Sequence, residues 1–172
     1  MSAAYELYIM RHGIATERGH GTAGDFKRKL TPDGRAKVEK IAMGLTRLGV
    51  EFDCILTSPL VRALETAQIV LDTYQGKMPM EVHDGLRPGE SADALLNFLS
   101  QQQQKARRIL LVGHEPDLSS FAARLLGAGE SNLVLKKGGC CLIELDEISI
   151  QSKGRLIWWL TPRVLKSIGQ GT

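Results

Sequence analysis

Three short apolar runs that each end abruptly in polar residues constrain the fold of this chain more than any other feature. The runs and the residues after them are 7–10 before Arg11-His12-Gly13, 52–56 before Thr57-Ser58-Pro59, and 108–113 before His114. Each run has the length and apolar content of a buried strand. The polar stretch after the first run leads into Thr31-Pro32-Asp33, which joins a capping hydroxyl, a proline and an acid in the manner of a helix start.

This alternation predicts an α/β fold, a three-layer sandwich with a mostly parallel central sheet and helices on both faces. Further strands are expected at residues 80–83, 140–145 and 155–160, the last two as an antiparallel hairpin at the sheet edge. Further helices are expected after Ser58, from Ser91 and after Pro116, and the tail from Lys166 is expected to be frayed. The length suits one domain over residues 1–172.

The composition indicates an ordinary globular protein, with 43% hydrophobic and 24% charged residues. A net charge of +3 lacks the strong basic bias of a nucleic-acid binder, and the basic clusters at 27–29 and 105–108 are interpreted as solvated surfaces. Three cysteines, two of them adjacent, make a poor disulfide framework. Neither a signal peptide nor a membrane span is evident. We therefore expect a cytoplasmic protein, and a monomer.

The polar residues after the strands predict a common site. Carboxyl ends of parallel strands meet at one edge of a sheet, so Arg11, His12 and His114 are expected to lie close together. Arg62 falls in the first turn of the helix expected after Ser58, where the helix dipole favours a neighbouring anion. Two arginines at this edge predict a pocket for a multiply charged oxyanion such as phosphate. Any one of these motifs alone is equally compatible with an ordinary strand end.

An imidazole in such a pocket acts either as an acid or base, or as the nucleophile that accepts a phosphoryl group. Arginines supply the positive charge that a metal would bring, and no metal-ligand motif occurs, so neither a metal nor a cofactor is expected. The glycine-containing stretch at 15–29 lacks the Gly-Lys-Ser/Thr of a P-loop, and we expect a loop there. His20, in that stretch, is expected to be an exposed loop residue.

Four ordered motifs resemble those of the histidine phosphatase superfamily, whose fold is phosphoglycerate mutase-like. They are the Arg-His-Gly segment at 7–13, the Leu-Thr-x-x-Gly helix start at 30–34, the second motif at 57–67 and the Gly-His-Glu-Pro motif at 112–116. The short length, Gly-His-Glu-Pro-Asp-Leu and the Trp-x-Leu-x-Pro ending from Trp158 are most similar to the SixA-type phosphohistidine phosphatase branch. The resemblance implies that His12 is the nucleophile, and that Arg11, Arg62 and His114 complete the phosphate pocket.

The chain departs from larger superfamily members at the proton donor. Those members carry a glutamate proton donor between the second and third motifs. In that region this chain has the segment 86–90, in which only Glu90 is a loose candidate, and Glu90 is also simply the residue before Ser91. A leaving imidazole needs less help from an acid than a leaving alkoxide does. We therefore expect a phosphohistidine-bearing protein as substrate. The alternatives are a small phosphorylated compound, hydrolysed by a phosphomonoesterase, and a non-catalytic phosphate-binding regulatory module.

Overall fold

A six-stranded mixed sheet forms the centre of the computed structural model, which describes residues 5–17, 21–102, 105–128 and 132–171. Its strand order is β3-β2-β4-β1-β5-β6, and β3, β2, β4 and β1 run parallel, whereas β5 pairs antiparallel with β1 and with β6. The strands are β1 (Tyr5–Arg11), β2 (Cys54–Thr57), β3 (Met80–Val82), β4 (Arg108–Gly113), β5 (Cys140–Leu145) and β6 (Arg155–Leu160). The predicted mostly parallel sheet and its edge hairpin are confirmed.

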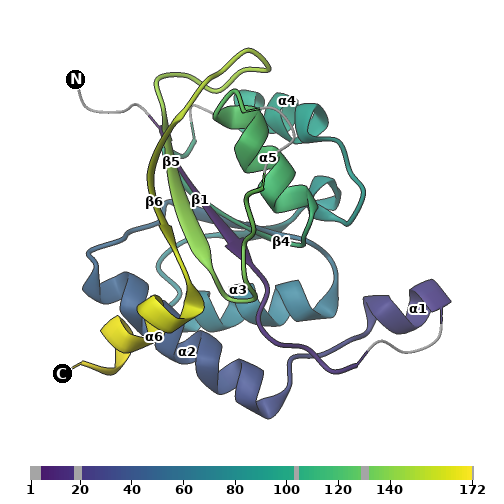
Figure 1. Ribbon diagram of the computed structural model, residues 1–172, viewed down its shortest axis with the longest axis vertical. Helices are drawn as coiled ribbons and strands as arrows, with labels where there is room; N and C mark the ends of the chain where they lie inside the picture. Colours follow the sequence, from purple (N-terminus) through teal and green to yellow (C-terminus); the bar gives the residue numbers. More distant parts are fainter. Residues whose placement is uncertain (1–4, 18–20, 103–104, 129–131, 172) are drawn as a thin grey trace.

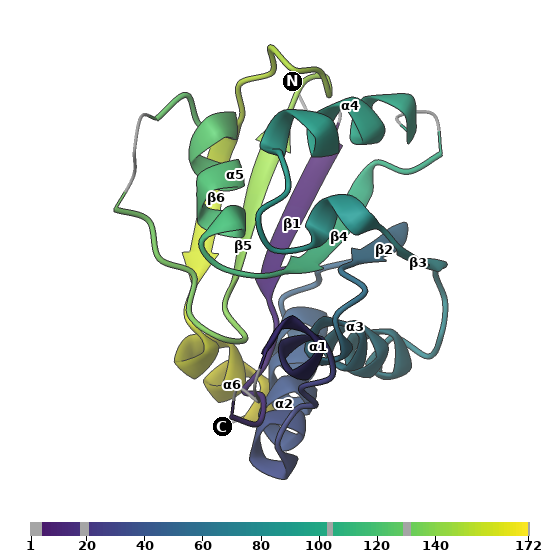
Figure 2. The same ribbon diagram turned by 90° about the vertical axis from the view of Figure 1, so that its right-hand side faces the viewer.

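Helices cover both faces of the sheet, as Figures 1 and 2 show. One face packs against α2 (Pro32–Arg47), α3 (Val61–Thr73) and α6 (Pro162–Gln170), and the other against α4 (Ala92–Gln102) and α5 (Asp117–Leu125). Alternate residues of each strand enter opposite cores: Tyr8 and Met10 face the first set of helices, while Leu7 and Ile9 face the second. This period of two fixes the three layers, and the predicted sandwich is confirmed.

The helix starts predicted from local sequence agree with the structure in some cases and differ from it in others. Thr31 caps α2 as expected, its hydroxyl accepting the Gly34 N–H at 2.9 Å. The helix after Ser58 begins later than predicted, because Leu60 occupies the N-cap position and Val61 begins α3. The expected frayed tail is wrong, since Thr161 caps α6 through the Val164 N–H and the helix runs to Gln170.

Two short helices also lie where no helix was predicted. The helix α1 (Gly21–Phe26) occupies the glycine-containing stretch, and a 3₁₀ helix, η1 (Asp84–Leu86), follows β3. His20 lies outside the described residues. Within the described ranges, no helix is both long enough and apolar enough to cross a membrane.

Candidate active site

Strand register brings the two histidines together. In the parallel pairing of β1 with β4, Arg11 lies opposite Gly113, so the next residues, His12 and His114, leave the sheet side by side. Their ring centroids are 5.2 Å apart, and the residues are only 5% and 3% exposed. The prediction that these strand ends share one edge of the sheet is confirmed.

The hydrogen bonds of His12 define its tautomer. Nδ1 lies 2.6 Å from the carbonyl oxygen of Gly13, which can only accept, so Nδ1 carries the proton. Nε2 lies 3.2 Å from Nε of Arg62, which can only donate, so Nε2 carries the lone pair. The ring therefore points an unprotonated nitrogen at an arginine side chain.

His114 is held by Ser58. Its Nε2 lies 2.8 Å from the Ser58 hydroxyl, which also accepts the Leu60 N–H at 3.3 Å. Ser58 and Pro59 are residue types typical of a helix start, but Ser58 does not cap α3. The chain turns before the helix, and the Ser58 hydroxyl orients an imidazole instead. Nδ1 of His114 is buried and has no hydrogen-bond partner among the described residues.

The two predicted arginines also reach this edge. Arg62, 4% exposed, lies in the first turn of α3 as expected, and its Nε contacts His12. Arg11 donates from Nη1 to the carbonyl of Leu135 at 3.0 Å, while its buried Nε lacks a partner among the described residues. A buried guanidinium N–H without an acceptor is unfavourable, so the site suits an anionic ligand.

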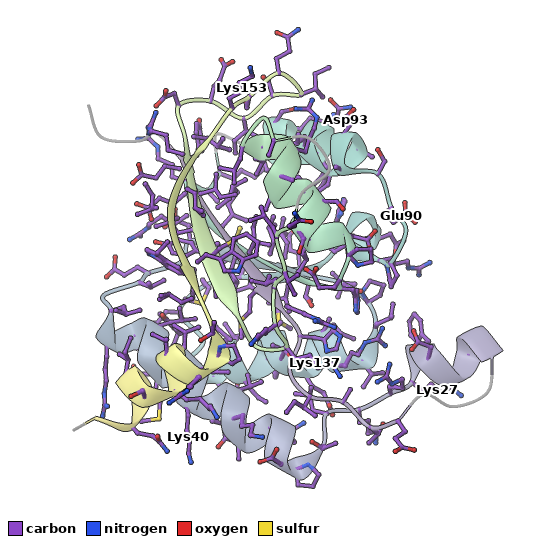
Figure 3. The ribbon with its side chains drawn as sticks, viewed as in Figure 1. Lys27, Lys40, Glu90, Asp93, Lys137 and Lys153 are labelled. Atoms are coloured by element: carbon purple, nitrogen blue, oxygen red, sulfur yellow. The ribbon has the colours of Figure 1, made fainter. Side chains whose placement is uncertain are left out.

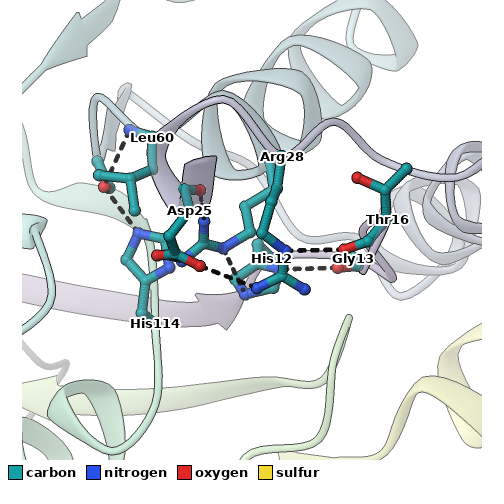
Figure 4. A network of polar contacts seen from close by, with 9 residues as sticks. His12, Gly13, Thr16, Asp25, Arg28, Leu60 and His114 are labelled. Atoms are coloured by element: carbon teal, nitrogen blue, oxygen red, sulfur yellow. Dashed lines mark hydrogen bonds and ion pairs between the residues drawn. The ribbon is translucent and has the colours of Figure 1, made fainter. Parts of the chain in front are cut away.

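Sequence reasoning missed a carboxylate that bridges two arginines (Figure 4). Asp25, on α1, accepts from Nη2 of Arg62 at 3.2 Å through Oδ2 and pairs with Nη1 of Arg28 at 3.1 Å through Oδ1. The Asp25 carbonyl also accepts from Arg62 Nη1 at 2.8 Å. Arg28 is therefore not part of a solvated basic face, because it is 17% exposed and paired beside the site. The spacing of three residues between Asp25 and Arg28 was the available signal.

Burial sets the protonation of both histidines. Removal from water, opposed by the Gly13 hydrogen bond and reinforced by the neighbouring positive charges, lowers the pKa of His12 from 6.5 to about 3. Burial and the charge of Arg62 lower the pKa of His114 to about 3 as well. Burial likewise lowers the pKa of Arg11. Both imidazoles are therefore neutral at physiological pH.

The backbone after His12 is fixed by close packing. The Gly13 N–H donates to the Thr66 hydroxyl at 3.0 Å, and that hydroxyl donates to the Arg62 carbonyl at 2.7 Å. A Cβ atom at Gly13 would lie 2.5 Å from Cγ2 of Val38. A glycine is therefore required here, because its small size lets α2 and α3 pack closely on both sides of the backbone at 12–14, which we call the histidine loop.

Glu90 occupies an exposed loop on the same side of the molecule as α1 (Figure 3). It lines a small cleft beside His114, together with Asp117, whose buried Oδ2 has no hydrogen-bond partner among the described residues. Glu90 thus lies at the rim of the site and outside the polar network around His12. No described group of three or more His, Cys, Asp or Glu side chains is arranged to hold a metal ion.

Comparisons with known proteins agree with this geometry. Residues 7–90 match the family model described as histidine phosphatase superfamily, branch 1. An uncharacterized protein of Picosynechococcus sp. is 40% identical over 149 residues, which are 86% of this chain and 89% of that protein. The phosphohistidine phosphatase SixA of Escherichia coli K12 is 27% identical over 162 residues, or 94% and 96% of the two chains.

The solved structures give the same result. The structure of the protein histidine phosphatase SixA complexed with tungstate has a TM-score of 0.81 and 25% identity, covering 93% of this chain and 99% of that one. This chain belongs to the histidine phosphatase superfamily, a class of phosphate-ester hydrolases. Within the superfamily, its relatives support the SixA-type branch.

Proposed function

We propose that the protein is a metal-independent phosphohistidine phosphatase that acts on a phosphohistidine-bearing protein. The observation that carries this proposal is the tautomer of His12, which holds an unprotonated Nε2 against Arg62 inside a buried pocket. Nε2 attacks phosphorus, the bond from phosphorus to the substrate imidazole breaks, and the imidazole leaves with that electron pair. Water then attacks phospho-His12, the P–Nε2 bond breaks, and phosphate is released with neutral His12 restored.

Arg11, Arg62 and His114 have separate roles in this proposal. The unpartnered Nε of Arg11 and the guanidinium of Arg62 bind phosphate oxygens and stabilise the charge of the transition state. His114, with Ser58 on Nε2, directs the other ring nitrogen towards the phosphate. Asp25 must give up part of its contact with the Arg62 guanidinium before Arg62 can bind phosphate oxygens. One chain can supply all these groups, and we propose a monomer with one catalytic domain over residues 1–172.

The leaving group distinguishes this function from its rival. A leaving imidazole keeps a proton on its second ring nitrogen, so no strong acid has to stand beside it. A small-molecule phosphomonoesterase is the second candidate, and the small cleft that Glu90 and Asp117 line beside His114 favours it. In that case Glu90 would protonate the leaving alkoxide. Loss of alkyl phosphate hydrolysis in Glu90→Ala would favour the rival.

The central experiment traps the intermediate. Purified protein is mixed with radiolabelled phosphohistidine protein and quenched at alkaline pH, where phosphoramidates survive. We expect an acid-labile label on the wild type and none on His12→Ala. Equal release of phosphate by both proteins would refute the mechanism.

A second experiment addresses the metal. Arg11 and Arg62 supply the positive charge in the proposed mechanism, so hydrolysis should continue in excess EDTA. Complete loss of hydrolysis that Mg²⁺ restores would show that a divalent ion is required.

A further inference from the structure

A cleft of about 270 Å³ lies between α2, α6 and the turn that precedes β5. Five of its lining side chains are cationic, and no aspartate or glutamate occurs among the described residues that line it. The five are Lys37, Lys136, Lys137, Arg163 and Lys166. We call it the basic cleft. The whole chain has a net charge of only +3, so this is a marked local concentration of positive charge.

The charges of the basic cleft are mostly unpaired. In the part of the chain that the structure describes, one of the five contacts a carboxylate: Lys37 Nζ lies 2.5 Å from Asp33 Oδ2. That pair is exposed and one helical turn apart, and such pairs contribute little. The remaining cations line the same cleft, so their potentials add there and are screened by salt over a Debye length of about 8 Å. An anion would relieve their mutual repulsion, so the cleft favours a negatively charged ligand.

The walls of the cleft are held rigidly. A Cβ atom at Gly34 would lie 2.1 Å from the Ile14 carbonyl oxygen, and one at Gly44 would lie 2.1 Å from that of Leu165. The backbones therefore touch where α2 meets the histidine loop and where it meets α6. Rigid packing of this kind preforms the cleft, so that a ligand need not order its walls.

The basic cleft and the phosphate pocket share a wall. The Gly138 N–H donates to the carbonyls of Arg11 and His12 at 3.0 and 3.1 Å. At the other end of the same turn, the Leu135 carbonyl accepts from the Arg11 side chain. Lys136 and Lys137 stand between these two anchors, and Gly13, which follows His12, also lines the cleft. A substrate surface seated over the phosphate pocket therefore lies next to these lysines.

We propose that the basic cleft docks acidic side chains of the phosphohistidine-bearing protein, beside the segment whose phosphohistidine enters the pocket. This inference rests on the proposed function, and it assigns to that substrate an acidic surface around the phosphohistidine. The proposal rests on charge complementarity. Five cations from three segments, with no carboxylate among the described lining residues, lie next to the histidine loop. Docking of this kind accelerates encounter and selects among phosphoproteins, with a strong dependence on ionic strength.

The test uses two synthetic phosphohistidine peptides with about six residues on each side, enough to reach roughly 20 Å when extended. One peptide carries glutamates and the other carries glutamines at the same positions. At low salt we expect the wild type to hydrolyse the acidic peptide with a kcat/KM at least about tenfold higher, through KM rather than kcat. In Lys136→Glu/Lys137→Glu the ratio should fall to about one or below.

The matched control is Lys105→Glu/Lys153→Glu, which makes the same charge change at exposed lysines before β4 and β6. Figure 3 shows Lys153 at the upper end of the molecule, whereas Lys137 lies in its lower half. The control should keep the preference of the wild type. Equal kcat/KM for both peptides in the wild type, or equal loss of preference in both double variants, would overturn the docking site.

Binding of the unphosphorylated acidic peptide provides a readout that does not depend on catalysis. Fluorescence titration should show binding to the wild type and the control, and at least about tenfold weaker binding to Lys136→Glu/Lys137→Glu. If the protein hydrolyses neither peptide yet binds the acidic one through these lysines, the proposed function fails and the docking site stands. Tighter binding of an oligonucleotide of equal charge would instead assign the cleft to nucleic acid and overturn the proposal.

Discussion

Acidification should destabilise the protein through its two buried histidines. Burial lowers the pKa of His12 and of His114 to about 3, against 6.5 in the unfolded chain. Below pH 6.5 the unfolded chain therefore binds protons at these positions that the folded chain does not. The stability associated with keeping these two imidazoles neutral is fully present above pH 6.5 and is lost progressively as the pH falls towards 3. The free energy of unfolding should thus decrease on acidification.

The expected size follows from the proton uptake. One proton taken up only by the unfolded state changes the free energy of unfolding by about 1.4 kcal/mol per pH unit. Between pH 7.5 and 5.5, with the unfolded pKa in between, each histidine contributes a loss of about 1.4 kcal/mol, and the pair about 2.7 kcal/mol. His12→Gln and His114→Gln should each remove about half of this loss.

Urea denaturation at the two pH values, in phosphate-free buffers, measures the effect. His83→Gln provides a comparison, because His83 is more exposed, although burial lowers its pKa too. Its removal should change the pH dependence less than removal of either site histidine. If His12→Gln and His114→Gln lose as much stability on acidification as the wild type, then burial does not hold these imidazoles neutral and the nucleophile assignment loses its basis.

Three further predictions concern the surroundings of the site. Asp25→Asn removes the charge that holds the two arginines, so orthovanadate, an anion of phosphate shape, should bind several-fold tighter in a calorimetric titration; unchanged affinity would show that this carboxylate does not compete with the anion. Gly169→Ala places a Cβ atom 1.9 Å from the Lys40 carbonyl oxygen, so the free energy of unfolding should fall by about 2 kcal/mol or more. Thermal melts measure this loss, and Ser167→Ala on the exposed side of α6 serves as a near-neutral control. Thr31→Ala removes the α2 cap and should reduce the free energy of unfolding by about 1 kcal/mol in urea; a loss below a few tenths would mean that water replaces the cap.

Local signals in the sequence predict the frame of the site well. The apolar run before Arg11 and the run before His114 each specify a buried strand, and parallel pairing then determines that their ends meet. The position of Arg62 near a helix start follows from Pro59 a few residues before it, even though α3 begins at Val61. These features depend on neighbours within a few residues, which is why composition and spacing reveal them.

Contacts between distant segments were not predictable in the same way. Asp25 meets Arg62 across 37 positions, and nothing local to either residue indicates the partner. Ser58 carries a capping signal that the structure uses for an imidazole, because the tertiary contact outweighs the local preference. The tail is a different case: Thr161-Pro162 repeats the start pattern of α2, and the nine residues from Pro162 to Gln170 form a short helix.

The separation of the two histidines is set by backbone pairing between β1 and β4, and by no loop. The stretch around Glu90 lies outside the polar network around His12 and can therefore change independently of the reacting pair, whereas α1 contacts Arg62 through Asp25. Replacing the stretch around Glu90 by one of another length should alter which phosphorylated compounds enter, while the imidazoles stay 5.2 Å apart. The sheet thus separates chemistry from selectivity, and a designer who wishes to redirect this scaffold can rebuild its entrance without touching its reaction centre.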